Sequence, residues 1–131
     1  MSDTGYVDTF ARDNLPPRDQ WPDCSCELPE FRFPARLNCA AVLLDDRVAR
    51  GQGDRVAILT PDGPCSYRQL LEQANRIANV LVEDMGLVPG NRVLLPSSNG
   101  LMMAACMFAI WKAGGIPVPT MALLRARELA Q

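Results

Sequence analysis

The residues from 92 to 119 constrain the fold of this chain more than any other stretch. Residues 92–95 are Arg-Val-Leu-Leu, a short apolar run typical of a buried strand. Residues 99–113 carry apolar side chains at helical spacing, and residues 116–119 form a second extended run after two glycines. A helix that links two strands in this order makes a crossover, so the strands are expected to be parallel. The pattern predicts an α/β fold with a βαβ unit.

The residues before this unit predict a helix and a hairpin. Apolar side chains recur at spacings of three and four over residues 37–48, and the glycines of residues 51–53 follow as a helix stop. Residues 56–59 are an apolar run that predicts a short strand. Residues 61–63, Pro-Asp-Gly, are a turn signal, and a second strand around Cys65 would close a hairpin.

A second helix is predicted after the hairpin. Ser66 and Gln69 have the spacing of a capping box, in which each residue bonds the backbone of the other. One apolar stripe follows at helical spacing: Leu70, Leu71, Ala74, Ile77, Ala78, Leu81 and Val82. Gly86 ends this helix, and residues 123–131 predict a last one. The expected order is therefore α-β-β-α-β-α-β-α.

Residues 1–36 differ in composition from residues 37–131. They contain five prolines with three large aromatic residues between them: Pro16, Pro17, Pro22, Pro29, Pro34, Trp21, Phe31 and Phe33. Prolines at this density oppose a regular helix and favour extended chain, and aromatic side chains need a surface to cover. We therefore expect an extended arm over 1–36, packed on a partial α/β domain over 37–131.

The overall composition excludes several classes of partner. The formal net charge is −2 and the chain has no basic stripe, which argues against nucleic acid. No apolar run reaches the ~18 residues of a membrane span, and the polar N-terminus lacks the pattern of a secretory signal. The cysteines number five, an odd count that suits reduced thiols better than disulfides. We therefore expect a cytoplasmic location and no membrane partner.

The residue types needed for common catalytic and metal sites are missing or badly spaced. The chain has no histidine, which excludes imidazole bases and Ser-His-Asp triads within it. Cys24-Ser25-Cys26 is the nearest approach to a metal motif, but zinc-binding pairs are usually roughly two to four residues apart. We expect reduced thiols and no structural metal.

The remaining charged and glycine-containing motifs favour structural roles. The acid pairs Asp45-Asp46 and Glu83-Asp84 fall on polar faces of predicted helices, where solvated charge is expected. Lys112, the only lysine, lies near a helix C-terminus and offsets the helix dipole there. Gly51-Gln52-Gly53 follows a helix and matches no phosphate-binding motif. The methionines between residues 102 and 107 are expected in the core. No catalytic, cofactor-binding or metal residue is assigned.

Four spaced motifs lie in a fixed order between residues 66 and 115. They are Ser-Tyr-Arg-Gln-Leu at 66–70, Asn-Arg-Ile-Ala-Asn-Val-Leu at 75–81, Gly-Leu-Val-Pro-Gly-Asn-Arg-Val at 86–93, and Ala-Ile-Trp-Lys-Ala-Gly-Gly at 109–115. Their order and separation resemble the N-terminal part of the adenylate-forming, AMP-binding superfamily of acyl-CoA synthetases, luciferases and peptide-synthetase adenylation domains. Residues 8–17, 37–40 and 123–129 resemble benzoate- and 2-aminobenzoate-CoA ligases in particular.

The resemblance implies an incomplete part of the large N-terminal domain of an adenylate-forming enzyme. Members of the family convert a carboxylic acid and ATP into an acyl-adenylate and pyrophosphate, and CoA then displaces AMP; Mg²⁺ assists. Their phosphate loop, adenine pocket, ribose-binding Asp and C-terminal Lys come later in the chain, so no functional residue carries over. We expect an N-terminal fragment of an ATP-dependent aromatic carboxylic acid–CoA ligase, catalytically incomplete and without a cofactor by itself.

Some residues depart from the family pattern, and a second hypothesis stays open. Gln69 stands where Glu is frequent and Asn91 where Asp is usual; residues 96–98, Pro117 and Pro119 also differ. The alternative is a stand-alone truncated α/β binding or oligomerisation module without enzymatic activity. The first hypothesis makes the remainder of a ligase chain the partner and predicts that the isolated chain self-associates, whereas in the second a partner covers the incomplete edge of the sheet. The reading frame beyond codon 131 would distinguish them.

Overall fold

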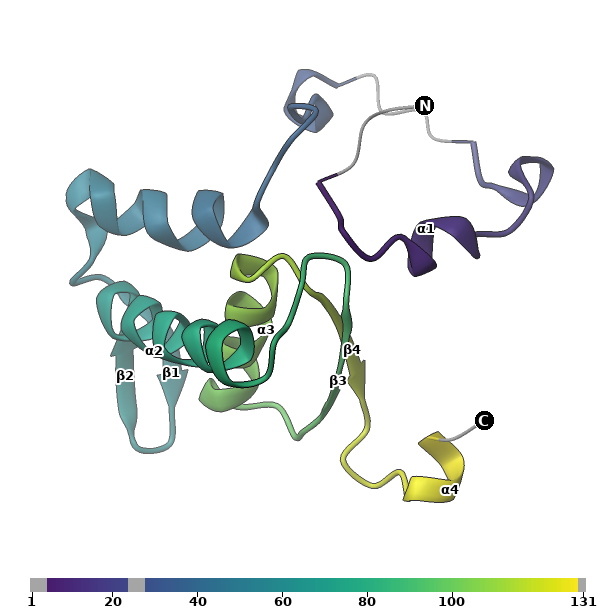
Figure 1. Cartoon of the computed structure of the whole chain (residues 1–131). Coiled ribbons are helices and arrows are strands. Elements are labelled where there is room, and N and C mark those ends of the chain that lie inside the picture. Colours follow the sequence, from purple (N-terminus) through teal and green to yellow (C-terminus); the bar gives the residue numbers. More distant parts are fainter. Residues whose placement is uncertain (1–4, 24–27, 130–131) are drawn as a thin grey trace.

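A computed structural model of the chain describes residues 5–23 and 28–129 (Figure 1). The elements after the arm appear in the predicted order. They are a helical stretch over 39–52, β1 (Val56–Thr60), β2 (Gly63–Ser66), α2 (Tyr67–Asn79), β3 (Arg92–Pro96), α3 (Leu101–Lys112), β4 (Ile116–Thr120) and α4 (Ala126–Leu129). Within the described residues α4 begins three positions later than the predicted helix over 123–131.

The strands of the described ranges form two separate pairs. β1 and β2 are an antiparallel hairpin that closes at the Thr60–Gly63 pair, as the turn at 61–63 predicts. β3 and β4 are parallel and in register from Arg92–Ile116 to Pro96–Thr120. The predicted βαβ unit is therefore confirmed, with α3 as its crossover helix.

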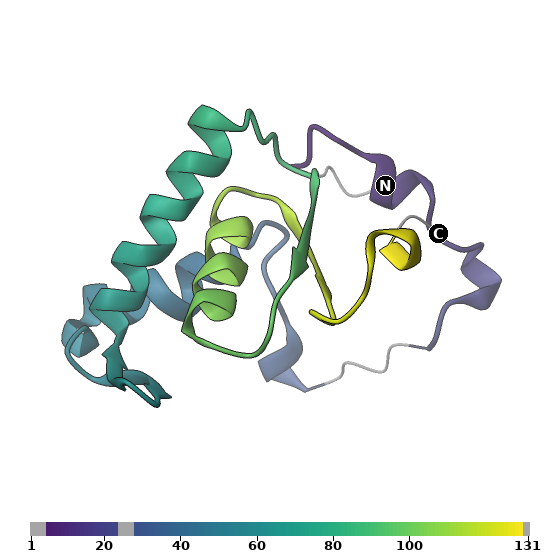
Figure 2. The same ribbon diagram turned by 90° about the horizontal axis from the view of Figure 1, so that it is seen from below.

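The layers of the body follow from this crossover. Figure 2 shows α3 between α2 on one side and the β3–β4 pair on the other. Short side chains lie where α2 and α3 meet: Ala74, Ala78, Ala105 and Ala109 are all buried. The largest fully buried side chains are Leu44 and Ile110. This core joins the helical stretch over 39–52, α2 and α3.

The second predicted helix begins as the sequence indicates. Ser66 Oγ accepts a hydrogen bond from Gln69 N at 3.2 Å, and Gln69 Oε1 accepts one from Ser66 N at 2.9 Å. The predicted capping box is thus confirmed. The helix continues beyond α2 as a π-helical segment, η5 (Val80–Asp84), in which Leu81 is buried.

The first predicted helix is also present, in two π-helical segments, η3 (Ala41–Asp45) and η4 (Val48–Gln52). Ala40 and Leu44 are fully buried, as their spacing predicts. Gly51 has φ +77°, a left-handed conformation that glycine adopts without strain, so the regular helix ends there. The glycines of residues 51–53 are therefore a cap and a loop, as expected.

The arm differs from the extended chain that was predicted. Its described residues include an α-helical turn, α1 (Phe10–Asp13), and the 3₁₀ turns η1 (Arg18–Gln20) and η2 (Pro29–Phe31). Proline fixes φ at a value that suits the start of a turn, and Pro17 and Pro29 lie at such starts. The prolines here begin short turns as well as preventing long helices.

Four aromatic side chains of the arm remain largely exposed, so they cover less of the body than the sequence suggested. Phe10, Trp21, Phe31 and Phe33 are 57%, 44%, 51% and 68% exposed. Trp21 Nε1 donates to Pro16 O at 2.7 Å, so its polar group is satisfied inside the arm. Figure 1 shows α1 and the turns that follow it standing apart from α2 and α3.

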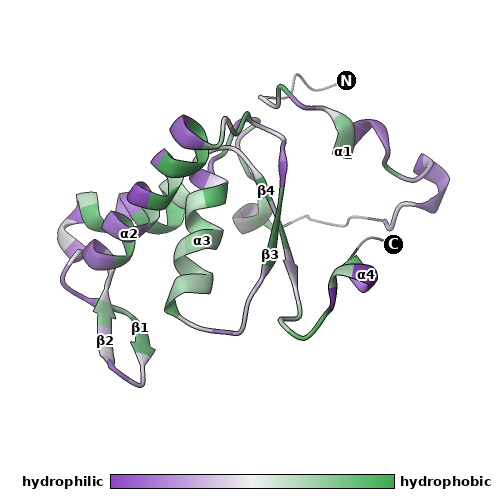
Figure 3. Ribbon diagram, turned by 60° about the horizontal axis from the view of Figure 1, so that its bottom comes forward, coloured by the Kyte–Doolittle hydropathy of each residue, from purple (hydrophilic) through white to green (hydrophobic). Residues whose placement is uncertain are grey.

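Apolar side chains also remain exposed on the body. Figure 3 shows that α3 is apolar around its circumference. Met102 on α3 is 56% exposed, and Leu94, on the strand next to it, is 48% exposed. The methionines were expected in the core, but Met102 is exposed, and Met103 and Met107 are half-buried. No helix within the described ranges is both long and apolar enough to cross a membrane.

Candidate functional site

The carboxyl ends of β3 and β4 border a hollow of about 440 Å³. This edge of a parallel sheet is where α/β folds commonly bind ligands. Its lining includes the polar residues Ser97, Ser98, Asn99 and Thr120 together with apolar Met103, and no lining side chain is charged. Thr120 Oγ1 is buried without a hydrogen-bond partner among the described residues. The hollow therefore offers hydroxyl and amide groups but no charge that could hold a metal or a phosphate.

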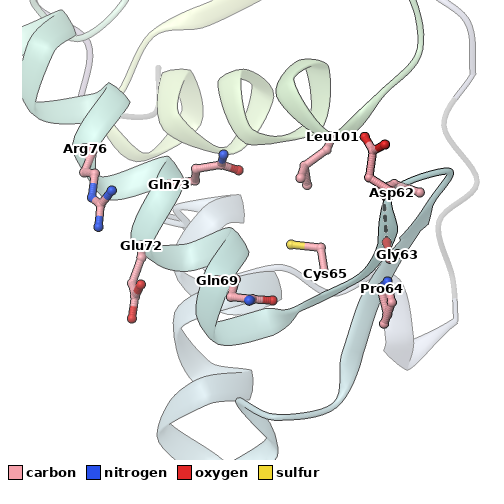
Figure 4. Close-up of a pocket in the computed structure, with 10 residues that line it drawn as sticks. Asp62, Gly63, Pro64, Cys65, Gln69, Glu72, Gln73, Arg76 and Leu101 are labelled. Carbon is pink, nitrogen blue, oxygen red and sulfur yellow. Dashed lines mark hydrogen bonds between the residues drawn. The ribbon is translucent and has the colours of Figure 1, made fainter.

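A second hollow, of about 320 Å³, lies between the hairpin and α2 (Figure 4). Gln73 and Cys65 point into it from α2 and β2. Gln73 Oε1 is buried without a partner in the part of the chain that the structure describes. The Cys65 thiol is buried and donates to Ser66 O at 3.6 Å. A thiol so enclosed packs as a small apolar group rather than reacting.

Lys112 and Asp45, which sequence patterns did not connect, meet at the C-terminal end of α3. Lys112 Nζ donates to Asp45 Oδ1 at 2.5 Å, and both side chains are partly buried. Asp45 was expected to be solvated charge, but it is paired with Lys112, and its Oδ2 is buried without a hydrogen-bond partner among the described residues. Asp46 agrees better with that expectation, since it is half-exposed and lies 3.7 Å from Arg50. Glu83 and Asp84 are exposed, as expected.

Asn38 is a structural residue that the sequence analysis missed. Its Oδ1 accepts hydrogen bonds from Ala40 N at 3.0 Å and Ala41 N at 3.2 Å, which caps the helical stretch over 39–52. Its Nδ2 donates to Trp111 O at 2.9 Å at the end of α3. An Asn followed by a helical apolar pattern is a recognised N-cap signal and could have identified the first contact. The second contact depends on the tertiary arrangement.

Replacing Asn38 by Ala should weaken the attachment of this helix to α3. The substitution removes the cap and the bond to Trp111 O, for an expected loss of about 1–2 kcal/mol in the free energy of unfolding. Hydrogen exchange at Ala40 and Ala41 measures the local effect and should become faster. Asn38→Asp is the control for the cap, because it keeps the capping acceptor while it replaces the donor to Trp111 O by a carboxylate oxygen. If both variants accelerated exchange at Ala40 and Ala41 equally, the capping role of Asn38 would be contradicted.

The remaining thiols and acids of the described residues are not gathered into a metal-binding group. Cys39, Cys65 and Cys106 are free, and burial raises the pKa of the Cys106 thiol, which makes it less reactive. Within the described ranges, no group of three or more Cys, Asp or Glu side chains could hold a metal ion. Cys24 and Cys26, the nearest approach to a metal motif in the sequence, lie outside the described residues.

Asp8 connects the arm to the body through polar contacts of its side chain. Its carboxylate accepts hydrogen bonds from Phe10 N, Arg92 and Asn91. These bonds, the one from Phe10 N foremost, hold the pKa of Asp8 below its ordinary value. The pKa of Asp13 is likewise lowered, chiefly because Thr9 Oγ1 donates to it at 2.6 Å. Asn91, a departure from the resembled pattern, is thus part of the contact that holds the arm.

Sequence comparison places the chain among known proteins. The family of AMP-binding enzymes matches residues 45–131. Salicyl-AMP ligase / salicyl-S-ArCP synthetase of Mycobacterium tuberculosis (strain ATCC 25618 / H37Rv) is 40% identical over 94 residues, which cover 71% of this chain and 16% of that protein. Benzoate–CoA ligase of Thauera aromatica is 27% identical over 96 residues, which cover 73% of this chain and 18% of that ligase.

Comparison of structures agrees with the sequence matches. The anthranilate CoA ligase AuaEII, solved in complex with anthranoyl-AMP, superposes with a TM-score of 0.66 at 28% sequence identity. The match covers 74% of this chain and 18% of that one. The chain therefore spans less than a fifth of the length of these proteins. The family match and these shared structural features show that the chain belongs to the AMP-binding, adenylate-forming enzymes and corresponds to part of their N-terminal domain.

Proposed function

We propose that this chain contributes the first helices and parallel strands of the large domain of an ATP-dependent ligase for aromatic carboxylic acids. The observation that carries the proposal is the chemistry common to the three relatives. Salicylate, benzoate and anthranilate share one benzoate framework. Salicylate carries a 2-hydroxyl group on it, anthranilate carries a 2-amino group, and benzoate has no substituent. Such a ligase first forms an acyl-adenylate from the acid and ATP, and it then forms a thioester with a thiol. Mg²⁺ is its cofactor.

CoA is the thiol that we propose for the second step. Benzoate–CoA ligase and the anthranilate CoA ligase are both named for it, whereas the mycobacterial relative is named for a product on ArCP. Of the two hollows described above, the one at the ends of β3 and β4 has no basic lining residue among the described residues and the one beside the hairpin has Arg76 alone, so we propose that later parts of the ligase hold CoA and ATP. The free thiols of the described residues suit a cytoplasmic enzyme.

The role of the chain in this proposal is structural, and its partner is the remainder of the ligase. α3 has apolar side chains on all sides, which is typical of a helix buried in a larger domain. A parallel pair such as β3–β4 normally belongs to a sheet covered on both faces. Later strands and helices of the ligase would supply that cover.

A chimera tests the proposal directly. The matching segment of the mycobacterial salicyl-AMP ligase, its relative at 40% identity, is replaced by this chain. The chimera should catalyse salicylate-dependent exchange of pyrophosphate into ATP, because its other residues supply the chemistry. The 131-residue polypeptide alone should stay at background with salicylate, benzoate or 2-aminobenzoate.

The controls are the host ligase without the segment, which should be inactive, and the intact host. A chimera that folds but shows no exchange would contradict the proposed structural role. Acid-dependent exchange of pyrophosphate into ATP by the isolated 131-residue chain would also contradict the structural role, since the chain would then contain catalytic residues of its own.

A further inference from the structure

The loop before β3, residues 89–92, contacts the arm through both backbone and side chains. Pro89 O accepts hydrogen bonds from Val7 N and Asp8 N, each at 2.9 Å. Asn91 Nδ2 donates to Asp8 Oδ2 at 2.8 Å, and Arg92 Nη1 donates to the same oxygen. One carboxylate of the arm thus receives an amide donor and a guanidinium donor from adjacent residues of the body. Bonds to an ionised acceptor are stronger than bonds between neutral groups.

Arg92 also contacts the aromatic ring two residues after Asp8. The centre of its guanidinium lies 4.7 Å from the centroid of the Phe10 ring, which is cation–π distance. Phe10 N donates to Asp8 Oδ1 at 2.9 Å, so the carboxylate and the ring are held in a fixed relation. The loop therefore recognises an Asp and an aromatic residue separated by one position. The Asp8 side chain is only 22% exposed in this arrangement.

Gly90 lets the arm approach the loop closely. Its φ is +97°, and a Cβ at this position would lie 2.0 Å from Asp8 O. Any side chain here would therefore displace the arm as well as strain the loop. The loop is fixed to the body on its other side, because Gly90 N donates to Gly114 O at 2.8 Å and Ile116 N donates to Asn91 O at 2.8 Å. These two bonds hold the loop to the body without involving the arm.

We propose that residues 89–92 form a carboxylate-binding clasp whose ligand is the Asp8–Phe10 segment of the arm. Asn91 is the residue that makes the clasp selective, because its Nδ2 donates to the carboxylate while its Oδ1 accepts from Val88 N at 3.1 Å. An Asp at this position would keep the bond from Val88 N and place a second carboxylate against the first. Two carboxylates at that separation repel each other. The clasp fastens the arm at one point and leaves the exposed aromatics beyond Phe10 outside it.

Swapping the hydrogen-bond donor and acceptor between Asn91 and Asp8 tests the clasp. Asn91→Asp introduces the repulsion, Asp8→Asn removes the charge, and the double variant restores one carboxylate and one amide with their positions exchanged. Hydrogen exchange followed by mass spectrometry is measured on the peptide that carries Val7 and Asp8, with every variant at the same protein concentration. Asn91→Asp should accelerate exchange there by about tenfold or more, the effect of losing a hydrogen bond to a charged group. The double variant should return to within about threefold of the original chain, because the amide–carboxylate bond is regained.

The body provides the control for unfolding. Exchange in α2 and at Ile116 should change little in all three variants, since these amides do not depend on the arm. Asn79→Asp, at an exposed position on α2, adds the same charge elsewhere and should leave the arm unchanged. Unaltered exchange at Val7 and Asp8 in Asn91→Asp would overturn the proposal. A double variant no slower than Asn91→Asp alone would also overturn it, because donor and acceptor would then not act as a pair.

Discussion

The isolated 131-residue chain is expected to associate with itself, or to precipitate, at micromolar concentration. Two features of the described residues lead to this expectation. β4 contains Pro117 and Pro119, which have no N–H to donate, but β3 pairs on one side only there and has an outer edge of free N–H and C=O groups. Such edges are templates for pairing with another chain.

Exposed apolar side chains act in the same direction. Leu59, Leu94, Met121 and Leu123 are 81%, 48%, 65% and 86% exposed. Large apolar patches are rare on stable monomers because burial of that surface is favourable. Association between copies would cover some of it, and the remainder of a related ligase, supplied in trans, should cover it better and reduce self-association.

Sedimentation velocity over a wide concentration range measures this directly. The predicted result is a mixture of species larger than the 14.4 kDa monomer, shifting to a defined complex when the ligase remainder is added. A single monomeric species with a cooperative thermal transition at all concentrations would contradict the expectation. It would show that the chain closes its own core and would favour the stand-alone module.

Replacing Ile110 by Ala should have the largest effect on stability of any single substitution in α3. Ile110 is 1% exposed and lies at the centre of the core that joins α2 and α3. It also packs against the turn after the helix, because a Cβ on Gly115 would lie 2.9 Å from Ile110 Cγ2. Removing the side chain leaves a cavity and should cost about 3 kcal/mol in the free energy of unfolding. That is a large share of the stability of a small domain, about 5–15 kcal/mol.

Urea unfolding followed by circular dichroism measures the loss, at concentrations below the onset of association. Met102→Ala is the matched control, since it shortens a side chain on the same helix at a position that is 56% exposed. Its expected effect is within about 0.5 kcal/mol. Similar losses in both variants would mean that α3 is not packed through Ile110 as described.

The sequence by itself determined the elements whose signals are local. The capping box of Ser66 and Gln69 and the turn at residues 61–63 appear as predicted, because each depends on residues within one turn of chain. The βαβ crossover is also confirmed, since a helix between two apolar runs leaves few connections open. Family membership followed from the order of the motifs between residues 66 and 115, and the family match over residues 45–131 confirms it.

Contacts between distant residues could only be decided by the tertiary structure. Lys112 was correctly placed at a helix end, but its pairing with Asp45 spans 67 positions and no local pattern predicts it. The bond from Asn91 to Asp8 spans 83 positions, so Asn91 stood out in the sequence only as a departure from a pattern. The arm shows the same limit: its prolines and aromatics predicted a covering segment, yet its aromatic side chains stay between 44% and 68% exposed. Composition specifies which side chains gain from burial, whereas the fold decides whether a partner surface lies within reach.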